Sequence, residues 1–519
     1  MGLTVRTKPL FYEREKALQS KTLPTILIVT PEVNYLPDQM GSLSTCLTAK
    51  AGGLADVSAT LIYELFRKGA NIHVAIPDYR AIFGNCLASL LKKEQADLRP
   101  ILPEDQLHLA KDQAFFYRQS VYSGNGDDNM KLSLAFQREV INNIVPRVNP
   151  DLIHCNDWMT GLLPAMARKK GIPCLFTIHN IHSIKTTLST IEDRGIDARH
   201  FWEHLYFERY PDSYEGSRNS NAIELLTSGV FAAHFVNTVS PNFLREIITG
   251  QHDFVSLPLQ QELTNKWNSG CAFGILNAPN PSFDPANDDD IYFHYGPKDH
   301  KTAKRKNKLA LQKMLGLIED EDAPLFFWPS RLDPLQKGCQ LLAEITYKVI
   351  SRYWDQKLEI VFVADGQYQQ VFKDIATYHG LIERIAVRNF DEHLEHFAYA
   401  AADFILMPSR FEPCGLPQMI GPIYGALPIA HDTGGIHDTV VHLNVSQNFG
   451  NGFLFKTYDS NGLLWAIDQA MHFYAMPVNL KQMQVERIMR QSAESFNYKV
   501  TAEEYIKLYE KMLIKPVVI

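Results

Sequence analysis

The chain has 519 residues and a formal net charge of -7 at pH 7, and 45% of its residues are hydrophobic. This length predicts roughly two to four domains with enough apolar side chains for sizeable cores. The mildly acidic balance argues against a dedicated nucleic-acid binder, which would usually present a strongly basic face.

The seven cysteines are scattered along the chain and form no Cys-x-x-Cys pair. Such a set is typical of a reducing compartment and argues against a disulfide framework or a structural zinc site. The N-terminal segment lacks the apolar core of a secretory signal, and no run is long enough to span a membrane. We therefore expect a cytoplasmic protein with no membrane anchor and no nucleic-acid partner.

Short apolar runs alternate with longer helical patterns along the whole chain. Nearly continuous runs of this kind are typical of parallel strands that are buried on both faces. Two series of them predict an α/β protein with two doubly wound, Rossmann-like domains. The predicted strands are 25–30, 71–77, 151–155, 174–179 and 234–240 in the first series, and 324–330, 358–365, 384–390, 403–409 and 427–433 in the second.

A cluster of Gly, Asn and Pro at 274–285 marks the expected seam between the domains. We assign residues 1–265 to the N-terminal domain, 266–490 to the C-terminal domain and 491–519 to a final helical segment. In that segment apolar residues recur at helical spacing, and Thr501 followed three residues later by a glutamate matches a capping box.

Ligands of open α/β sheets bind beyond the carboxyl ends of the strands. After the first strand, Lys50, Gly52, Gly53 and Asp56 lie in the segment KAGGLAD, which opens a helical pattern. Two glycines at a helix start let backbone amides approach an anion, and the lysine adds a charge. A plain turn is the ordinary alternative for such a pair.

Polar residues also end the third and fourth strands. Asp157 lies in the segment HCNDW, and His179 and Asn180 lie in the segment TIHN. Side chains at two neighbouring strand ends are suited to hydrogen bonds with the hydroxyl groups of a sugar, although a lone histidine at such a place is more often structural.

In the second series, Arg331 and Lys337 follow a strand within one loop. Together they would form a cationic pocket for a diphosphate leaving group, whereas two solvated surface charges are the alternative. The segment PSRFEPCGL at 408–416 follows another strand and places the carboxylate of Glu412 ahead of a predicted helix. A third glycine-rich turn, Thr433-Gly434-Gly435, follows the last strand.

In order and approximate spacing, these segments resemble the motifs of bacterial glycogen synthases and plant starch synthases, from about residue 25 to 513. The resemblance implies a glycosyltransferase B-type fold with a cleft between the domains and a last helix that crosses back to the first domain. It implies a retaining glucosyltransferase that transfers glucose from ADP-glucose, or UDP-glucose, to the non-reducing end of an α-1,4-glucan (glycogen or starch). The nucleotide-sugar is then a co-substrate, and no metal or other cofactor is expected.

The same resemblance implies a role for each matching residue. Arg331 and Lys337 would hold the donor diphosphate, Glu412 would be the essential carboxylate near the donor glucose, and His179 would contact the transferred glucose. The other residues expected to bind donor or acceptor are Lys50, Gly52, Gly53, Asp56, Asp157, Asn180, Cys414, Gly415, Leu416, Thr433, Gly434 and Gly435.

Three features depart from the family pattern: the loop from Arg331 to Lys337 is one residue longer, Pro417 stands where threonine is common, and the excursion before Lys50 is longer. Proline has no N–H to offer a phosphate, but it suits the first turn of a helix. The run 392–396 contains two histidines and two glutamates without the HExxH spacing, so we expect a solvated helix there. Two alternatives stay open, a transferase with a small-molecule acceptor and a non-catalytic glucan-binding homologue.

Overall fold

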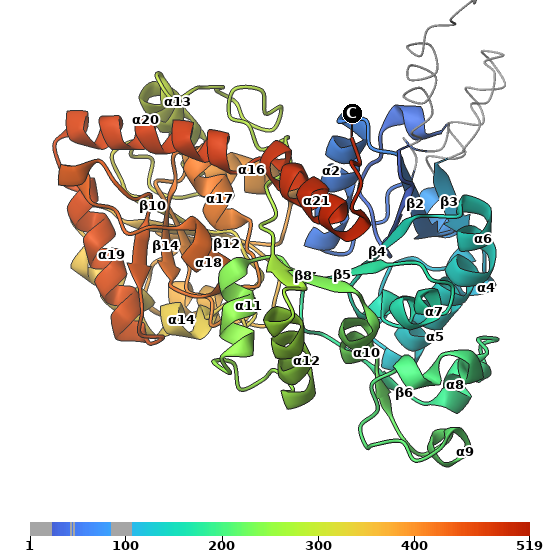
Figure 1. Ribbon diagram of the computed structural model, residues 1–519. Coiled ribbons are helices and arrows are strands. Elements are labelled where there is room, and N and C mark those ends of the chain that lie inside the picture. The colour runs from blue at the N-terminus through green and yellow to red at the C-terminus, as the bar shows by residue number, and fades with distance from the viewer. Residues whose placement is uncertain (1–22, 42–43, 45–46, 85–105, 519) are drawn as a thin grey trace, which may run out of the picture.

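The computed structural model describes residues 23–41, 44, 47–84 and 106–518. Within them, two parallel sheets form the cores of two domains that lie side by side (Figure 1). The two doubly wound domains expected from the sequence are confirmed. Each sheet is covered by helices on both faces, as the nearly continuous apolar runs require.

The N-terminal domain has a seven-stranded sheet in the order β3-β2-β1-β4-β5-β8-β9. Its strands are β1 (Ile26–Val29), β2 (Ile72–Pro77), β3 (Leu107–Ala110), β4 (Leu152–Asn156), β5 (Cys174–Ile178), β8 (Phe235–Thr238) and β9 (Ala272–Gly274), and β6 (Lys185–Thr186) pairs antiparallel with β7 (Ile223–Glu224). Its α-helices are α2 (Gly53–Arg67), α4 (Gln113–Phe116), α5 (Gly126–Glu139), α6 (Val145–Val148), α7 (Leu163–Arg168), α8 (Leu188–Glu192), α9 (Tyr214–Ser217), α10 (Leu225–Ala232), α11 (Pro241–Ile248) and α12 (Leu257–Asn268). Short helical turns are η1 (Asp38–Met40), η3 (Val140–Ile144), η4 (Trp158–Thr160), η5 (Ala198–His200) and η6 (Trp202–His204).

The C-terminal domain has a six-stranded sheet in the order β12-β11-β10-β13-β14-β15. Its strands are β10 (Leu325–Trp328), β11 (Glu359–Val363), β12 (Ile385–Arg388), β13 (Phe404–Met407), β14 (Leu427–His431) and β15 (Phe453–Phe455). The helices are α13 (His300–Leu315), α14 (Cys339–Arg352), α15 (Gln369–Tyr378), α16 (Glu392–Ala401), α17 (Pro417–Ile423), α18 (Gly434–Thr439), α19 (Ser460–Tyr474) and α20 (Val478–Ser495), with the short turn η7 (Val445–Gln447) and the final helix α21 (Tyr498–Leu513).

Every one of the ten runs predicted as strands overlaps a strand of one of these sheets, although β4 extends one residue beyond its run. The strands β3, β9 and β15 were not predicted from the sequence. Each is only three or four residues long and lies at the edge of its sheet. An edge strand buries less surface than a central one, so its apolar run is shorter and harder to recognise.

The order of the strands identifies two positions at which ligands usually bind in such folds. In both sheets the order reverses beside the first strand, between β1 and β4 in one domain and between β10 and β13 in the other. Loops that leave two neighbouring strands in opposite directions at such a switch point open a crevice beyond the carboxyl ends. Most of the predicted site residues follow β1, β4, β10 or β13.

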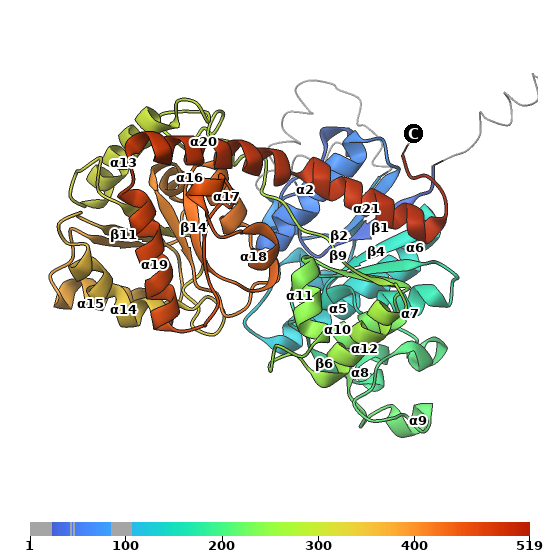
Figure 2. The ribbon, with the colours of Figure 1, turned by 60° about the vertical axis from the view of Figure 1, so that its left-hand side comes forward.

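The final two helices join the domains. Figures 1 and 2 show α20 along the C-terminal domain and α21 continuing across to the N-terminal one. There α21 contacts α2, and the buried hydroxyl of Tyr509 lies 2.8 Å from Nδ1 of His154 on β4. Of the final segment assigned as residues 491–519, residues 498–513 form α21 and residues 491–495 end α20. The predicted capping box is wrong. Asn497 caps the helix, and Thr501 donates instead to the carbonyl of Leu276, 2.9 Å away, because tertiary contact offers its hydroxyl a better-placed acceptor.

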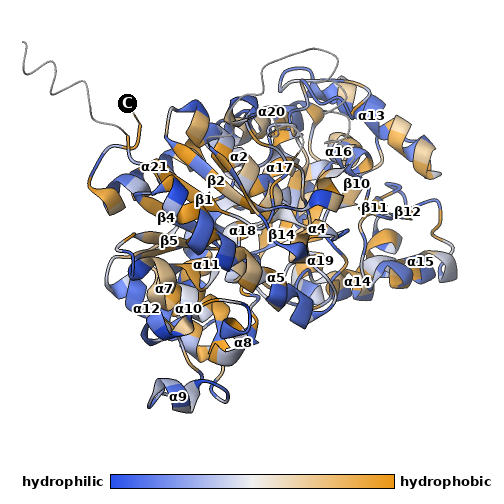
Figure 3. Ribbon diagram, turned by 90° about the vertical axis from the view of Figure 1, so that its right-hand side faces the viewer, coloured by the Kyte–Doolittle hydropathy of each residue, from blue (hydrophilic) through white to orange (hydrophobic). Residues whose placement is uncertain are grey.

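Apolar side chains pack into one core cluster in the N-terminal domain and two in the C-terminal domain, one on each face of its sheet. The helices have mixed apolar and polar faces, visible as alternating orange and blue along their length in Figure 3. Such helices bury one side against the sheet and leave the other to solvent. None of the helices in the described part of the chain is long and apolar enough to cross a membrane.

Candidate active site

The C-terminal switch point brings together a lysine and a buried carboxylate. Nζ of Lys337 lies 2.6 Å from Oε2 of Glu412, and the hydroxyl of Ser409 donates to the same oxygen at 3.1 Å. Both partners of this ion pair are largely shielded from solvent, with side-chain exposures of 13% and 6%. The sequence placed these two residues on different loops, and the fold joins them.

Arg331 follows β10 in the same crevice and is exposed. Among the described residues its guanidinium has no ion-pair or hydrogen-bond partner. Five N–H donors in a rigid fork are therefore available to a phosphate group.

Although the loop between Arg331 and Lys337 is longer, Lys337 still contacts the carboxylate of Glu412. The carboxylate of Asp333 accepts the backbone N–H of Leu335 at 2.8 Å, and the side chain of Leu335 is 77% exposed. Gly338 then turns into α14 with φ 70°, and a Cβ there would lie 1.9 Å from the carbonyl oxygen of Pro408. Glycine at this position lets the lysine loop lie against the start of the PSRFEPCGL segment.

The remainder of that segment builds the entry to α17. Cys414 is buried, and burial raises the pKa of its thiol to about 12, so it is an apolar packing group and not a nucleophile. Gly415 has φ 73°, and Leu416 precedes the helix. Pro417 occupies the first helical turn, where its missing N–H costs no intrahelical hydrogen bond.

The Thr433-Gly434-Gly435 turn is occupied by the protein's own groups. The amide of Gly434 donates to Oε1 of Glu246 on α11 at 2.8 Å, and the amide of Gly435 donates to the carbonyl of Glu412 at 2.9 Å. The Thr433 hydroxyl lies 3.3 Å from both oxygens of Glu246. Burial opposes the charge of Glu246, but His252 and the Gly434 amide outweigh it and lower the pKa below its ordinary value.

This contact is one half of a reciprocal link between the domains. In the other half, Asp438 on α18 accepts from the Ser240 hydroxyl at 2.5 Å and from the Asn242 amide at 3.0 Å, at the start of α11. In each domain, a carboxylate thus accepts a hydrogen bond from a backbone amide at the start of a helix in the other domain, where the helix itself offers no acceptor. The Gly435 amide thus holds the backbone of Glu412 in place. Both glycine amides of the turn donate hydrogen bonds to acceptors within the protein.

The N-terminal switch point is organised by Glu32, a buried carboxylate after β1. It accepts the backbone amides of Ala51 and Gly52 at 2.8 and 3.0 Å, and the hydroxyl of Tyr122 at 2.9 Å. Burial raises the pKa of Glu32 above its ordinary value, against the lowering effect of those hydrogen bonds. A Cβ built on Gly52 or Gly53 meets nothing within 4 Å, so these glycines keep open space in front of the start of α2.

Lys50 reaches from this loop to the opposite domain. Its Nζ lies 3.1 Å from Asp56 on α2 and 3.2 Å from Glu392 at the start of α16. Burial opposes its charge, but the two carboxylates outweigh that effect and raise the pKa of Lys50. The contact with Glu392 places Lys50 at the boundary between the two domains.

Asp157 and His179 form a buried polar group beyond β4 and β5. Oδ1 of Asp157 accepts the His179 amide at 2.7 Å, and Oδ2 accepts the Asn180 side-chain amide at 3.0 Å. Burial raises the pKa of Asp157 to about 7, despite these hydrogen bonds. Asp157 has φ 56°, a region that non-glycine residues rarely occupy and that often marks functional sites.

His179 is a neutral imidazole at physiological pH. Burial lowers the pKa of His179 to about 3. Its Nε2 lies 2.9 Å from Oδ1 of Asn156, which can only accept, so Nε2 carries the proton. The lone pair of Nδ1 then remains as an acceptor for a hydroxyl group.

Sequence reasoning missed several groups that shape this site. Glu32, Glu246 and Glu392 bind the predicted loops, and the side-chain oxygen of the buried Asn277 has no hydrogen-bond partner within the described residues. Asn277 lies in the cluster of Gly, Asn and Pro at 274–285, which was interpreted only as the seam between the domains. Glu32 and Glu246 lie in no motif, and Glu392 was expected only on a solvated helix.

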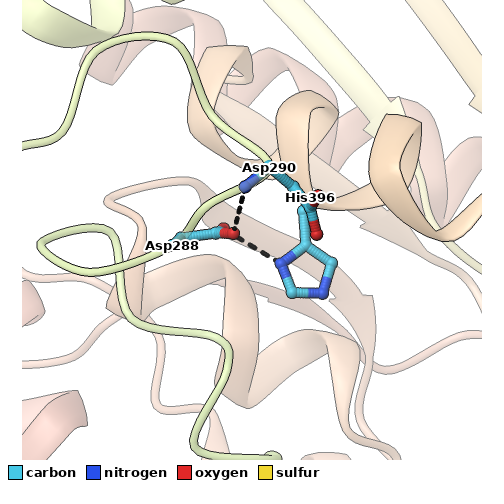
Figure 4. A group of neighbouring side chains, drawn as sticks. All are labelled: Asp288, Asp290 and His396. Carbon is cyan, nitrogen blue, oxygen red and sulfur yellow. Dashed lines mark hydrogen bonds and ion pairs between the residues drawn. The ribbon is translucent and has the colours of Figure 1, made fainter.

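The run 392–396 is not the fully solvated helix that we predicted. His393 is exposed, but His396 is buried, and its Nδ1 lies 2.9 Å from Oδ2 of Asp288 (Figure 4). With Asp290, these two residues place possible ligand atoms within 4.8 Å of one another. Oδ1 of Asp288, however, accepts the amide of Asp290 at 3.0 Å, while Tyr424 donates to Oδ2. We interpret the group as a buried hydrogen-bonded anchor for α16.

Two doubly wound domains, with an arginine, a lysine and a carboxylate after the strands of one and buried polar groups after the strands of the other, are the arrangement of two-domain glycosyltransferases. Two family models match the chain, "Starch synthase catalytic domain" over residues 25–258 and "Glycosyl transferases group 1" over residues 316–486.

The chain belongs to the glycogen synthase and starch synthase family. It is 32% identical to a glycogen synthase of Moorella thermoacetica, over 94% of this chain and 97% of that protein. It is 30% identical to a glycogen synthase of Geobacillus thermodenitrificans, over 90% of this chain and 96% of that protein.

Solved structures are similar over the same extent. The catalytic domain of starch synthase IV from Arabidopsis thaliana, bound to ADP and acarbose, superposes with a TM-score of 0.74 at 26% identity and covers 95% of this chain and 100% of that one. A sucrose-phosphate synthase from Thermosynechococcus elongatus shares the fold, with a TM-score of 0.56 at 16% identity over 95% of this chain and 99% of that one.

Proposed function

We propose that this protein is a glycogen or starch synthase that transfers glucose from ADP-glucose to the non-reducing end of an α-1,4-glucan with retention of configuration. The main support is the pairing of Lys337 with the buried Glu412 at the C-terminal switch point, together with Arg331 at the start of the same loop, which has no partner among the described residues. The two relatives named above are glycogen synthases, and the similar starch synthase structure was solved with ADP and acarbose.

In this proposal the donor diphosphate binds Arg331 and Lys337. Breaking the bond between the anomeric carbon and the phosphate oxygen leaves negative charge on the phosphate and positive charge on the sugar. Preorganised cations at the phosphate lower that barrier, and such electrostatic terms are usually the largest in catalysis. Lys50 would add its charge from the other domain once the phosphate replaces its present partner Glu392.

The sugar would lie between the two switch points. Glu412 and the free Nδ1 of His179 are acceptors for its hydroxyl groups, and Asp157 holds the His179 loop in place. The acceptor's hydroxyl oxygen attacks the anomeric carbon on the face that the phosphate leaves, and its proton passes to the leaving phosphate oxygen. This route retains the α configuration and needs no covalent nucleophile and no metal. We also propose a cytoplasmic location.

The decisive experiment is a donor and acceptor comparison with the full chain. ADP-glucose and UDP-glucose are each incubated with and without glycogen, while nucleotide release and glucan chain length are followed. We expect ADP release that depends on glycogen, with longer chains and a lower rate from UDP-glucose. Release with a small acceptor instead would support a small-molecule transferase, and glycogen retention without turnover would support a non-catalytic homologue.

A further inference from the structure

A cavity lined by both charged and apolar side chains lies in the C-terminal domain, away from the residues discussed so far. It has a volume of about 250 Å³ and is enclosed by α13, the end of α19, α20 and the starts of β13 and β14. Phe404 and Leu427 of its wall begin the strands β13 and β14. The candidate active site follows the carboxyl ends of those strands. The cavity therefore lies at the opposite, amino ends of the same strands.

The charges around this cavity are unevenly matched. Five lysine and arginine side chains line it, against three carboxylates. All three carboxylates are taken: Arg305 pairs with Glu321 and Asp322, and Lys308 lies 2.6 Å from Asp403. The remaining cations are Lys301, Lys304 and Lys481, in a chain whose net charge is -7.

Lys304 is a buried ammonium group without a carboxylate partner in the described part of the chain. Its Nζ donates to the carbonyls of Tyr424 at 2.9 Å and Ala400 at 3.2 Å. Burial lowers the pKa of Lys304 to about 7, because neutral carbonyls compensate a buried charge only in part. An anion in the cavity would supply the missing counter-charge.

Two of the unpaired cations keep free donors for such an anion. Lys301 is exposed on the first turn of α13 and has no hydrogen-bond or ion-pair partner among the described residues. Lys481 on α20 donates one hydrogen to the carbonyl of Tyr474 at 2.6 Å and keeps two more. The wall beside them is apolar, formed by Phe404, Phe473, Val478 and Val485.

We propose that this cavity binds a small organic monophosphate, with the phosphate held by Lys301 and Lys481 near Lys304 and the organic part against the accessible side chains of Val478 and Val485. The apolar wall favours a phosphate ester over inorganic phosphate, which would leave that surface uncovered. The volume lies just below the usual range for ligand pockets, about 300–1,000 Å³, so the cavity suits a compact monoester and is too small for a nucleotide-sugar.

The test is calorimetric titration of the full chain with phenyl phosphate, which combines a phosphate with an aromatic ring. Inorganic phosphate and phenol serve as the two half-probes, and every titration is run with and without saturating ADP. We expect phenyl phosphate to bind one site whether ADP is present or not, and more tightly than either half-probe. Failure to bind, or loss of binding when ADP is added, would overturn the proposal.

Charge variants locate the site. The double variant Lys301→Glu, Lys481→Glu should weaken phenyl phosphate binding by about tenfold or more, the usual scale for charge-assisted hydrogen bonds. The matched control is the double variant Lys306→Glu, Lys313→Glu, which changes two exposed lysines on the same helix that do not line the cavity. It should change the Kd by less than about twofold, because exposed charges at a distance are screened by solvent. Equal weakening in both variants would mean that only the overall charge matters and would contradict the assignment.

Discussion

The two switch points of this protein have the same strand topology but opposite electrostatic character. The C-terminal one presents Arg331 and Lys337, and the carboxylate of Glu412 is paired with Lys337. The N-terminal one contains the buried carboxylates of Glu32 and Asp157 and the neutral imidazole of His179. Its cation, Lys50, already pairs with two carboxylates.

Because of this difference, the two crevices are suited to different parts of a nucleotide-sugar. Phosphates need unpaired cations, and only the C-terminal crevice has an exposed arginine without a partner in the described residues. Sugar hydroxyl groups need fixed acceptors and donors, which the N-terminal crevice provides around Asp157 and His179. A glucosyl diphosphate would therefore bind with its phosphates toward one domain and its sugar toward the other. Four predictions test this contrast.

The largest effect is expected from Glu412→Gln at the C-terminal switch point. The neutral amide keeps the shape but removes the charge paired with Lys337, so we expect kcat to fall by about 10²–10³, the scale of losing one preorganised polar group. Glycogen-dependent nucleotide release measures kcat, with Glu383→Gln, an exposed carboxylate, as the control. A kcat within tenfold of wild type would show that this carboxylate is not central to catalysis.

Next in size is the contrast between Arg331→Ala and Lys337→Met. Both should reduce kcat/KM for the donor by roughly 10–100-fold, because each removes a charge-assisted hydrogen bond to phosphate. Only Lys337→Met should also lower Tm, since it leaves Glu412 buried without its partner, whereas Arg331 has none to lose in the described structure. Thermal unfolding of both variants checks this, and an equal drop in Tm would contradict it.

A pH effect on stability is expected at the N-terminal switch point. The pKa of Asp157 is raised from its ordinary 3.8 to about 7, so the folded state holds the proton more tightly than the unfolded state. The resulting stability is fully present below pH 3.8 and is lost as pH rises through about 7. Urea unfolding between pH 4 and 8 should therefore show a decline in wild type that is smaller in Asp157→Asn. Parallel curves for the two proteins would rule out this titration.

The smallest effect is expected from Glu392→Gln, at the boundary between the crevices. The ion pair with Lys50 is partly exposed, so its removal should change the donor KM by less than about fivefold. The direction should be a lower KM, because Lys50 is then freer to meet a phosphate. A higher KM would indicate that Glu392 itself contacts the donor.

Much of the fold and the positions of the candidate site could be predicted from the chain alone. Central strands such as β1, β10 and β13 are buried on both faces, and their apolar runs are therefore plain. Short edge strands such as β15 and the burial of His396 could not be predicted, because the first has a weak local pattern and the second depends on Asp288, more than a hundred residues away.

By itself, the sequence determined which residues follow the strand ends, and thus where Arg331, Glu412 and His179 would be. Only the tertiary structure decided their partners: Lys337 for Glu412, Glu246 for the amide of Gly434, and Glu392 for Lys50. Strand and helix patterns arise from neighbours along the chain, so they are visible in the order of residues. The ion pair between Lys50 and Glu392 joins residues 342 positions apart, and no local pattern records which charges the packing will bring together.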